Sequence, residues 1–457
     1  MGTTRVERVT VLEHPAGRVY DWHTRPGAFE RLTPPWEDVQ LVRREGGLED
    51  GAVTELRIRR GPATLTWLAR HRDHVPGRQF TDVQEQGPFA SWTHVHRFEP
   101  VADANCRMVD RIDYAAPLGP LGLVADELFL RSSVERMLRY RHATLAADLA
   151  AHARAGGAPL VVAVSGASGL VGRALRAFLT SGGHRVRALV RREASGPDEI
   201  AWNPAAGTID AAALEGVDAV VHLAGENIAA GRWSDGQKAK IRESRVQGTA
   251  LLARTLAGLA RRPTVFVSAS ASGVYGDGGD TIFTEDAPSG TGFLADVGRA
   301  WEEATAAARD AGIRVVLPRF GIVLSPAGGA LAKMLPAFQC GAGGRLGSGR
   351  QWMSWLSVDD AIGIIHQAVV DARLRGPVNA ASPEPVTNAE FTAVLGRVLA
   401  RPTVAAVPAA ALRLLFGEMA DATLLGSTRL APQALERVGY PWRHAELEGA
   451  LRHVMGR

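Results

Sequence analysis

Three glycines, Gly166, Gly169 and Gly172, follow a short apolar segment with a spacing that suits the binding of a phosphate group. Residues 160–164 are apolar and rich in valine, which predicts a strand buried on both faces. From residue 170 to residue 179, apolar side chains recur at helical spacing. A glycine turn between such a strand and helix directs backbone N–H groups toward a pyrophosphate. The alternative is a tight turn that binds no ligand.

Each glycine has a separate expected task in this loop. Gly166 makes the tight turn, Gly169 lets the backbone approach a pyrophosphate, and Gly172 lets the helix pack close to the strand. We therefore expect the loop to bind a dinucleotide cofactor through Gly166, Ser168, Gly169, Leu170, Val171 and Gly172.

Two arginines at the end of the next predicted strand indicate which dinucleotide binds. Residues 185–190 form this strand, and Arg191 and Arg192 follow it with no acidic residue before Glu193. In dinucleotide-binding folds an acidic residue here holds the ribose 2′-hydroxyl, whereas an arginine accommodates a 2′-phosphate. We therefore predict NADP(H) as the cofactor, held in part by Arg191 and Arg192. The alternative is a solvated arginine pair.

The remaining strands of this region alternate with helices. Buried strands are predicted at residues 217–224, 263–268 and 313–318, and helices at residues 237–260 and 296–311. This alternation predicts an α/β fold, a Rossmann-like doubly wound parallel sheet. Ligands bind at the carboxyl edge of such sheets. We therefore expect further cofactor contacts from Leu223, Ala224, Gly225 and Ser268.

The first third of the chain is predicted to be a separate α+β domain. Its expected elements are short helices within residues 15–32, a long amphipathic helix at 123–153, and strands at 6–12, 39–46, 52–59, 63–73, 78–86, 91–100 and 105–114. One antiparallel sheet gripping one long helix encloses a cavity. With residues 22–36 and 87–92, this order resembles the START-like (SRPBCC, polyketide-cyclase-like) superfamily. The resemblance implies an apolar ligand in the cavity, and some members are catalytic.

These patterns predict the domain organisation. A START-like domain covers residues 1–153, a glycine-rich linker 154–159, the NADP-binding domain 160–376, and a small subdomain on the substrate side 377–457. In the last part, helices are expected at residues 388–399, 409–420 and 444–454. Residues 341–349 contain five glycines, and this segment is either a loop that closes over a ligand or a structural crossover.

The composition is that of an ordinary globular protein and excludes several classes of function. The 457 residues are 46% hydrophobic and 22% charged, with a net charge of +4. Since acidic residues are interspersed with the arginines, we expect no nucleic-acid partner. The sequence offers no apolar signal core and no run long enough to span a membrane, so we expect a cytoplasmic protein. The two cysteines, Cys106 and Cys340, form no metal or redox pattern.

Four histidines in the first domain are also weighed as metal ligands. His94 and His96 share one face of a strand, with His71 and His74 on a neighbouring segment. A metal site requires converging ligands, and the sequence closes no recognisable ligand set. We therefore expect no metal, and histidines that line a cavity or a wet sheet face.

Several motifs resemble the extended short-chain dehydrogenase/reductases, the NAD-dependent epimerase/dehydratase group. They are GASGLVG at residues 166–172, HLAG at 222–225, SASASGVYG at 268–276 and SVDDA at 357–361. Residues 232–233, 244–245, 301–302 and 341–355 look like an epimerase-like subfamily sometimes labelled a cell-division inhibitor. Its C-terminal domain of unknown function is matched by residues 380–430, and a START-like domain in front is a combination also seen there.

The chain departs from this family at the catalytic residues. The family moves a proton with a Tyr-x-x-x-Lys pair and a Ser or Thr, while the nicotinamide moves a hydride. This sequence has Leu294 in place of the Tyr and Gly298 in place of the Lys. The hydroxyls that remain near the site are Ser270, Ser272 and Tyr275, and these are the candidate catalytic residues.

The sequence thus favours an NADP(H)-dependent oxidoreductase or epimerase-like enzyme that acts on a small molecule. Arg232, Trp233, Arg245, Arg299 and Trp301 would suit an anionic or ring-bearing substrate, or else are core and surface residues. The alternative function is a non-catalytic NADP(H)-binding sensor or protein-interaction module, since the Tyr and Lys are absent. The sequence indicates neither the substrate nor the oligomeric state.

Overall fold

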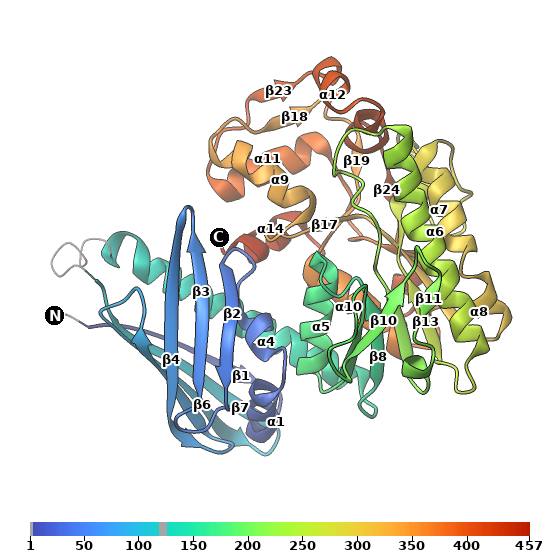
Figure 1. Ribbon diagram of the computed structural model, residues 1–457. Coiled ribbons are helices and arrows are strands. Elements are labelled where there is room, and N and C mark those ends of the chain that lie inside the picture. The colour runs from blue at the N-terminus through green and yellow to red at the C-terminus, as the bar shows by residue number, and fades with distance from the viewer. Residues whose placement is uncertain (1–2, 118–125) are drawn as a thin grey trace. The chain divides into compact units, whose positions relative to one another are not determined.

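The chain folds into two compact units, and the computed structural model describes residues 3–117 and 126–457 (Figure 1). The first unit extends to Arg154, and the second consists mainly of Ala155–Leu179 and His184–Met455. None of the helices in the described ranges combines the length and the apolar character that crossing a bilayer requires.

The first unit is a seven-stranded antiparallel sheet with one long helix. The strand order is β1-β7-β6-β5-β4-β3-β2, and each neighbouring pair is antiparallel. The strands are β1 Thr4–Leu12, β2 Asp38–Glu45, β3 Val53–Arg60, β4 Ala63–Val75, β5 Gln79–Gln86, β6 Ser91–Ala102 and β7 Asn105–Ala115. The helices are α1 Ala16–Thr24, α2 Ala28–Leu32, the π-helix Asp126–Leu130 and α4 Arg131–Ala155. The predicted helix-grip fold is confirmed, and residues 123–125 of the expected long helix lie outside the described residues.

Helix α4 closes this unit with one apolar face. Leu145 and Leu149 pack in a core cluster with Phe98, while Val134 and Leu138 belong to a second cluster around the other end of the sheet. These four positions recur at helical spacing, as an amphipathic helix requires. Burial of each such side chain stabilises the docked helix by roughly 1.5–3 kcal/mol.

The second unit is built on a doubly wound sheet that is almost entirely parallel. The strand order is β11-β10-β9-β8-β12-β13-β16-β14, with β21 beside β16. Only β10 and β11 pair antiparallel in this sheet. From β8 the chain moves outward through β9 and β10, then returns to β12 on the other side of β8. The carboxyl ends of β8 and β12 therefore flank the point where the strand order reverses, and such folds bind ligands there.

The elements of this sheet layer have the following bounds. The strands are β8 Val161–Ser165, β9 Arg185–Val190, β10 Glu199–Asn203, β11 Thr208–Ile209, β12 Ala219–His222, β13 Val265–Ser268, β14 Ser270–Ala271, β16 Arg314–Phe320 and β21 Gly376–Ala380. The helices are α5 Leu170–Ser181, α6 Asp235–Gly258, α7 Phe293–Glu303, α8 Ala306–Asp310 and α10 Val358–Val370, with 3-10 turns η2 Ala212–Leu214 and η3 Ser272–Tyr275.

Four two-stranded sheets and further helices complete the second unit. The sheets pair β15 with β24, β17 with β20, β18 with β23 and β19 with β22. Their strands are β15 Ile282–Phe283, β17 Ile322–Leu324, β18 Gly344–Leu346, β19 Trp352–Met353, β20 Trp355–Ser357, β22 Val386–Thr387, β23 Ala405–Val407 and β24 Arg429–Leu430. The helices are α9 Gly329–Gln339, α11 Asn388–Leu399, α12 Ala409–Phe416, the π-helix Ala420–Leu424, α13 Gln433–Arg437 and α14 Leu447–Met455.

Two local expectations differ from the structure, and in a third case the structure decides between two alternatives that the sequence leaves open. The helix expected at 296–311 is divided between α7 and α8, because the Thr305 hydroxyl donates to the Glu302 carbonyl at 2.6 Å and competes with the helical pattern. The boundary expected after residue 376 falls inside β21, which pairs with β16 in the main sheet. The glycine-rich segment 341–349 contains β18, where a Cβ at Gly344 would lie 1.8 Å from the Ala405 carbonyl oxygen. These glycines therefore serve a structural crossover.

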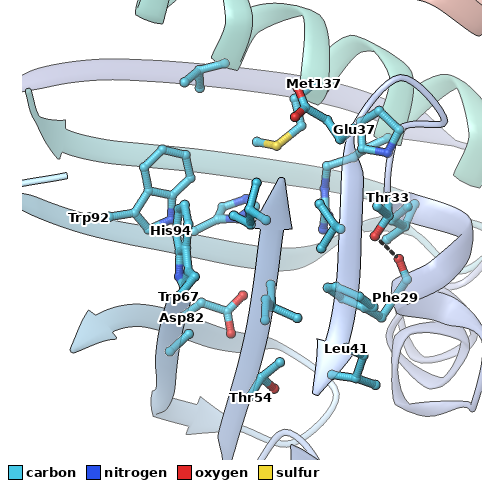
Figure 2. Close-up of a pocket in the computed structure, with 18 of the residues that line it drawn as sticks. Phe29, Thr33, Glu37, Leu41, Thr54, Trp67, Asp82, Trp92, His94 and Met137 are labelled. Atoms are coloured by element: carbon cyan, nitrogen blue, oxygen red, sulfur yellow. Dashed lines mark hydrogen bonds between the residues drawn. The ribbon is translucent and has the colours of Figure 1, made fainter. Parts of the chain in front are cut away.

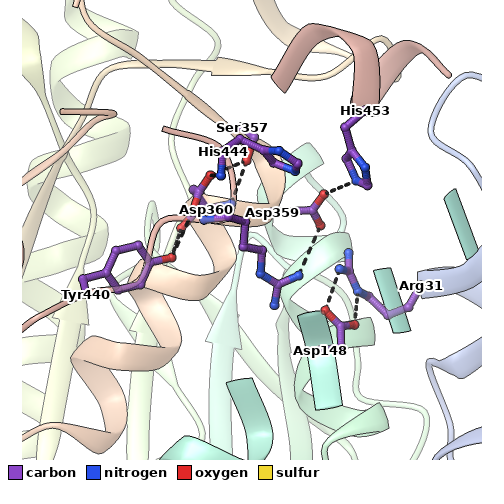
Figure 3. Close-up of polar contacts among 9 residues, drawn as sticks. Arg31, Asp148, Ser357, Asp359, Asp360, Tyr440, His444 and His453 are labelled. Atoms are coloured by element: carbon purple, nitrogen blue, oxygen red, sulfur yellow. Dashed lines mark hydrogen bonds and ion pairs between the residues drawn. The ribbon is translucent and has the colours of Figure 1, made fainter. Parts of the chain in front are cut away.

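A buried carboxylate ties the C-terminal residues to helix α10. Asp360 accepts hydrogen bonds from the backbone N–H of Arg443 at 2.8 Å and of His444 at 3.1 Å (Figure 3). The Ser357 hydroxyl donates to the same carboxylate at 2.8 Å and caps the helix. Burial raises the pKa of Asp360, and the backbone donors partly oppose this effect. Asp360, the second aspartate of the SVDDA motif, thus has a structural role, because it fixes residues 443 and 444 to helix α10.

A buried ion pair links α2 to α4 within the first unit. The guanidinium of Arg31 donates through Nε and Nη2 to the Asp148 carboxylate at 2.7 and 2.9 Å (Figure 3). The two side chains are 4% and 0% exposed. Removing one partner of such a pair leaves a charge in the interior without its matching carboxylate.

Replacing Asp148 with alanine is expected to destabilise the first unit by about 3–5 kcal/mol, because Arg31 stays buried after losing this carboxylate. Urea unfolding of the full chain, followed by near-ultraviolet circular dichroism, measures the loss. The control is Glu85→Ala, which removes the partner of Arg70 from an exposed pair with side chains 31% and 37% exposed. Its loss should be much smaller. Equal losses in the two variants would contradict the prediction.

Candidate functional site

At two positions of the loop after β8, the surrounding backbone leaves no space for a side chain, so only glycine fits. Gly166 has φ +67°, and a Cβ there would lie 2.8 Å from the backbone nitrogen of Ala224. A Cβ at Gly172 would lie 2.1 Å from the Gly166 carbonyl oxygen. Helix α5 therefore packs directly on the turn. Ser168 and Gly169 are exposed at the start of this helix, which leaves the loop accessible to a ligand.

Three polar side chains lie in a row across β8, β12 and β13 beneath this loop. Ser165, His222 and Ser268 are register partners on adjacent parallel strands. The Ser165 hydroxyl lies 2.5 Å from His222 Nδ1, and the Leu223 N–H donates to Ser165 at 3.2 Å. Burial lowers the pKa of His222 to about 3, and the charge of Arg245 adds to this effect. The neutral imidazole thus helps to hold the turn that begins at Leu223.

The hydroxyl of Ser268 lies inside the sheet. Its side chain is fully buried, and the oxygen has no hydrogen-bond partner among the described residues. The turn of Leu223, Ala224 and Gly225 is in contrast only partly buried and lies against Gly166. The structure thus brings this turn and the glycine loop together and places the Ser268 side chain below them. The cofactor contacts of all these residues stay predictions.

The two arginines after β9 have different surroundings. Arg192 binds Glu199 through both terminal nitrogens, at 2.7 and 2.5 Å. Hydrogen bonds from Arg192 and then Ser195 lower the pKa of Glu199 to about 2. Arg191 is exposed and forms no ion pair with any residue of the described ranges. Sequence reasoning missed Glu199, although this residue begins the strand that pairs with β9 beside Ala188.

Arg245 brings a positive charge to the carboxyl edge of the sheet. Its Nη1 donates to the carbonyl oxygens of Glu226 and Ile241 at 3.0 Å each, and its guanidinium lies 5.0 Å from the Trp301 ring. A Cβ at Gly225 would lie 3.3 Å from its Cζ. Burial lowers the pKa of Arg245 to about 10. Since none of the carboxylates in the described part of the chain pairs with it, this cation can attract an anionic ligand.

A buried ion pair holds two of the three hydroxyls predicted to be catalytic. Arg319 donates to both oxygens of Glu302 at 2.8 Å and to the phenolic oxygen of Tyr275 at 2.7 Å. Ser270 donates to the same carboxylate at 2.7 Å, and Tyr275 donates to Asn379 Oδ1 at 2.7 Å. Burial raises the pKa of Tyr275, so its phenol stays protonated at neutral pH. Both hydroxyls are engaged inside the protein in this arrangement.

Helix α7 fills the positions of the absent Tyr and Lys by close packing. A Cβ at Gly298 would lie 3.0 Å from the Val274 Cβ, and one at Gly273 would lie 3.2 Å from the Leu294 Cβ. A side chain at position 298 would therefore require Val274 in η3 to shift by a few tenths of an ångström. Ser272, at the start of that turn, is partly exposed and forms no hydrogen bond within the described ranges. It is the most accessible of the three candidate hydroxyls.

Comparison with known proteins assigns the second unit to a family. A model of the NAD dependent epimerase/dehydratase family matches residues 162–380, and an epimerase family protein from Mycobacterium bovis is 46% identical over 299 residues. That match covers 65% of this chain and 98% of the relative. The chain belongs to the NAD-dependent epimerase/dehydratase family. The resemblance predicted from the motifs is confirmed.

The other parts of the chain also have matches. Residues 12–139 match the family of polyketide cyclase / dehydrase and lipid transport, and residues 407–454 match a domain of unknown function, farther along than the expected 380–430. A crystal structure from Corynebacterium glutamicum, described as a nucleoside-diphosphate sugar epimerase, is 37% identical with a TM-score of 0.81. The match covers 99% of this chain and 90% of the chain in that crystal structure.

A second solved relative was crystallised with a cofactor. Human epimerase family protein SDR39U1 with NADPH is 32% identical to this chain, with a TM-score of 0.60. The match covers 65% of this chain and 99% of the human chain. The likeness in this case concerns the part of the chain that carries the epimerase fold.

The first unit of this family member contains a partly open cavity of about 500 Å³ (Figure 2). Much of its wall is apolar, with Phe29, Leu32, Val39, Leu41, Leu56, Ile58, Leu65, Trp67, Phe89, Trp92, Val134 and Met137. Three of the histidines predicted to line a cavity, His71, His94 and His96, do so, whereas His74 instead contacts the Tyr20 hydroxyl at 2.7 Å. Sequence reasoning missed Asp82, which lies across from His94 in the register of β5 and β6.

Acid is expected to destabilise the protein through His222. Because its pKa is about 3 in the folded chain and near 6.5 in the unfolded chain, the unfolded chain takes up a proton first as the pH falls. Stability should therefore decrease from about pH 6.5 downward, by up to about 1.4 kcal/mol per pH unit for this group. Urea unfolding at several pH values measures the slope.

The variant His222→Gln removes this titration and keeps a polar side chain. Its stability should depend less steeply on pH between about 6.5 and 4 than that of the wild type. The other buried histidines contribute equally to both proteins. Identical slopes would show that His222 does not titrate in this way.

Proposed function

We propose that the second unit binds NADP(H) at the carboxyl edge of its sheet. The glycine loop carries this proposal, because Gly166 and Gly172 have no room for a Cβ while Ser168 and Gly169 remain accessible at the start of α5. A pyrophosphate against the first N–H groups of α5 would be stabilised by the helix dipole. The human relative crystallised with NADPH supports the choice of cofactor. When bound, NADP(H) supplies hydride transfer.

Arg191 is the residue proposed to read the 2′-phosphate. It is exposed at the end of β9 and pairs with no carboxylate of the described ranges. Arg192 is held by Glu199 and would need to exchange that partner before it could bind a phosphate. The preference for NADP(H) over NAD(H) is therefore assigned mainly to Arg191.

The proposed substrate is a phosphate-bearing small molecule. Arg245 offers a cation without a carboxylate partner in the described residues, and Trp301 lies under its guanidinium. The relative from Corynebacterium glutamicum is described as a nucleoside-diphosphate sugar epimerase, and a nucleoside-diphosphate sugar carries phosphate groups. A sugar nucleotide would place its phosphates near Arg245 and its ring toward η3.

The proposed reaction is an oxidoreduction or an epimerisation in which Ser272 hydrogen-bonds the reacting oxygen. Ser270 and Tyr275 would act through the buried network of Arg319 and Glu302.

The packing of Leu294 and Gly298 against η3 favours an alternative function without catalysis. Without the Tyr and Lys, the protein would bind NADP(H) as a sensor or as a protein-interaction module.

The first unit is proposed to bind an apolar molecule. The cavity of about 500 Å³ is large enough for a small organic ligand, and its aromatic and aliphatic side chains favour an apolar one. The match of residues 12–139 to polyketide cyclase / dehydrase and lipid transport proteins supports this part of the proposal.

Arg191→Ala is expected to weaken NADPH binding by about 10–100-fold, the effect of losing one or two hydrogen bonds to a charged group. NADH binding should not change, because NADH has no 2′-phosphate. Fluorescence titration of the full chain with both nucleotides measures the two affinities. The control Arg185→Ala removes an exposed arginine at the start of the same strand, where its partner is Asp198 at 2.7 Å. Equal affinity of the wild type for NADPH and NADH would contradict the proposal.

Ser272→Ala is expected to reduce turnover by about 100-fold, the lower range for a residue that positions or transfers a proton. Turnover is reported by NADP⁺ reduction in the presence of UDP-glucose, whose sugar hydroxyl can donate a hydride, and by NADPH oxidation in the presence of a 4-keto sugar nucleotide, whose carbonyl can accept one. Ser289→Ala is the control, since Ser289 is an exposed serine outside the network of Arg319 and Glu302. A wild type that binds NADPH tightly and never oxidises it would favour the sensor instead.

A further inference from the structure

Three potential metal ligands meet in the polar wall of the cavity in the first unit. Asp82 on β5 lies directly opposite His94 on β6, and His96 follows two residues later on the same face. A carboxylate oxygen of Asp82 and one ring nitrogen of each histidine lie within 4.8 Å of one another. All three residues line the cavity, and Figure 2 labels Asp82 and His94 among the side chains of its wall.

Neighbouring residues hold two of these groups in orientations that suit a metal. His96 Nδ1 lies 2.6 Å from Asp110 Oδ1, so the Asp110 carboxylate fixes the tautomer in which Nε2 can ligate. That Nε2 lies 3.3 Å from Asp82 Oδ2. Two ligands with bonds of about 2.0–2.2 Å to one ion are separated by about this distance. The other oxygen of Asp82 lies 2.7 Å from His71 Nε2, which orients the carboxylate.

His94 supplies a second, independent observation. Its side chain is 7% exposed, and its Nε2 is buried without a hydrogen-bond partner among the described residues. Asp110 Oδ1 lies 3.6 Å from this nitrogen, beyond the range of a hydrogen bond. Buried polar atoms are almost always satisfied, so an unsatisfied ring nitrogen on a member of this group indicates a missing binding partner. A cation in this group would supply that partner.

We propose that Asp82, His94 and His96 bind one divalent first-row transition ion. Two imidazoles and one carboxylate form a ligand set that suits Zn²⁺, Fe²⁺ or Co²⁺. Asp110 and His71 would be outer partners that orient the ligands. The inference concerns the first unit alone and does not depend on nucleotide binding by the second.

The position of the group in the cavity wall indicates what the ion would do. Three protein ligands leave at least one coordination position open, as in catalytic rather than structural metal sites. The three metal-binding residues line a largely apolar cavity. The molecule that occupies the open coordination position is therefore an apolar one with a single oxygen-bearing group, such as a carboxylate or a carbonyl. The metal would fix its polar end while the aromatic wall packs on the rest.

A second group in the described residues must be distinguished from this one. Asp359, His444 and His453 also offer three ligand atoms within 4.8 Å of one another. None of these three residues belongs to the described lining of the cavity. His444→Gln is therefore a matched control, since it removes a histidine from the second group and leaves the cavity unchanged.

The test uses the full chain without an affinity tag, stripped of metal by a chelator and titrated with Co²⁺ and with Zn²⁺. We expect one equivalent of Co²⁺ to bind with a visible absorption spectrum of nitrogen and oxygen ligation, and Zn²⁺ to displace it. His94→Gln and Asp82→Asn should each weaken binding by about 100-fold or more, beyond the effect of losing an outer partner. His444→Gln should bind as the wild type does.

Three outcomes would overturn the proposal. The wild type could bind no stoichiometric ion, in which case a proton on His96 bridges the two carboxylates. His94→Gln could bind as tightly as the wild type, or His444→Gln could lose the binding. Zn²⁺ should also raise the melting temperature of the wild type and of His444→Gln. This measurement and the stoichiometry of the wild type remain decisive even if a cavity variant does not fold.

Discussion

The close approach of helix α5 to the turn after β8 is the constraint on which the second unit depends. A Cβ at Gly172 would overlap the Gly166 carbonyl oxygen, and one at Gly166 would overlap the chain at Ala224. Because the strand order reverses between β8 and β12, the glycine loop and the turn after His222 meet at one edge. The contact between Gly172 and the Gly166 carbonyl thus packs the helix and also leaves the backbone at Ser168 and Gly169 exposed to solvent. Structure and nucleotide binding have the same physical cause here.

The region where the family places its proton-transfer residues is organised differently in this chain. A buried Arg319–Glu302 ion pair connects Ser270, Tyr275 and Asn379 in one network. Such a network is costly to bury unless its members are well bonded, and these side chains are. The small residues of α7 and η3 then allow the two elements to touch. The absence of the Tyr and Lys is therefore accompanied by close packing of α7 on η3 beside a well-bonded buried network.

The first unit combines an apolar cavity with a polar strip on its sheet. The strip arises from register, since Asp82, His94, His96 and Asp110 occupy facing positions on β5, β6 and β7. Hydrogen bonds and ion pairs join the carboxylates to the histidines, which makes their burial tolerable. The strip therefore places charged and polar groups in the wall of an otherwise largely apolar cavity.

The sequence by itself determined the fold class, the glycine loop and the family, because periodic burial and turn glycines are local signals. All seven strands of the first unit and most helices of the second were predicted for the same reason. Only the tertiary structure decided which polar groups meet. It paired Arg192 with Glu199, buried Ser268 inside the sheet, and brought Asp82 to His94. These contacts depend on strand register and on the packing of distant segments, and the spacing of residues along the chain does not encode them in a readable way.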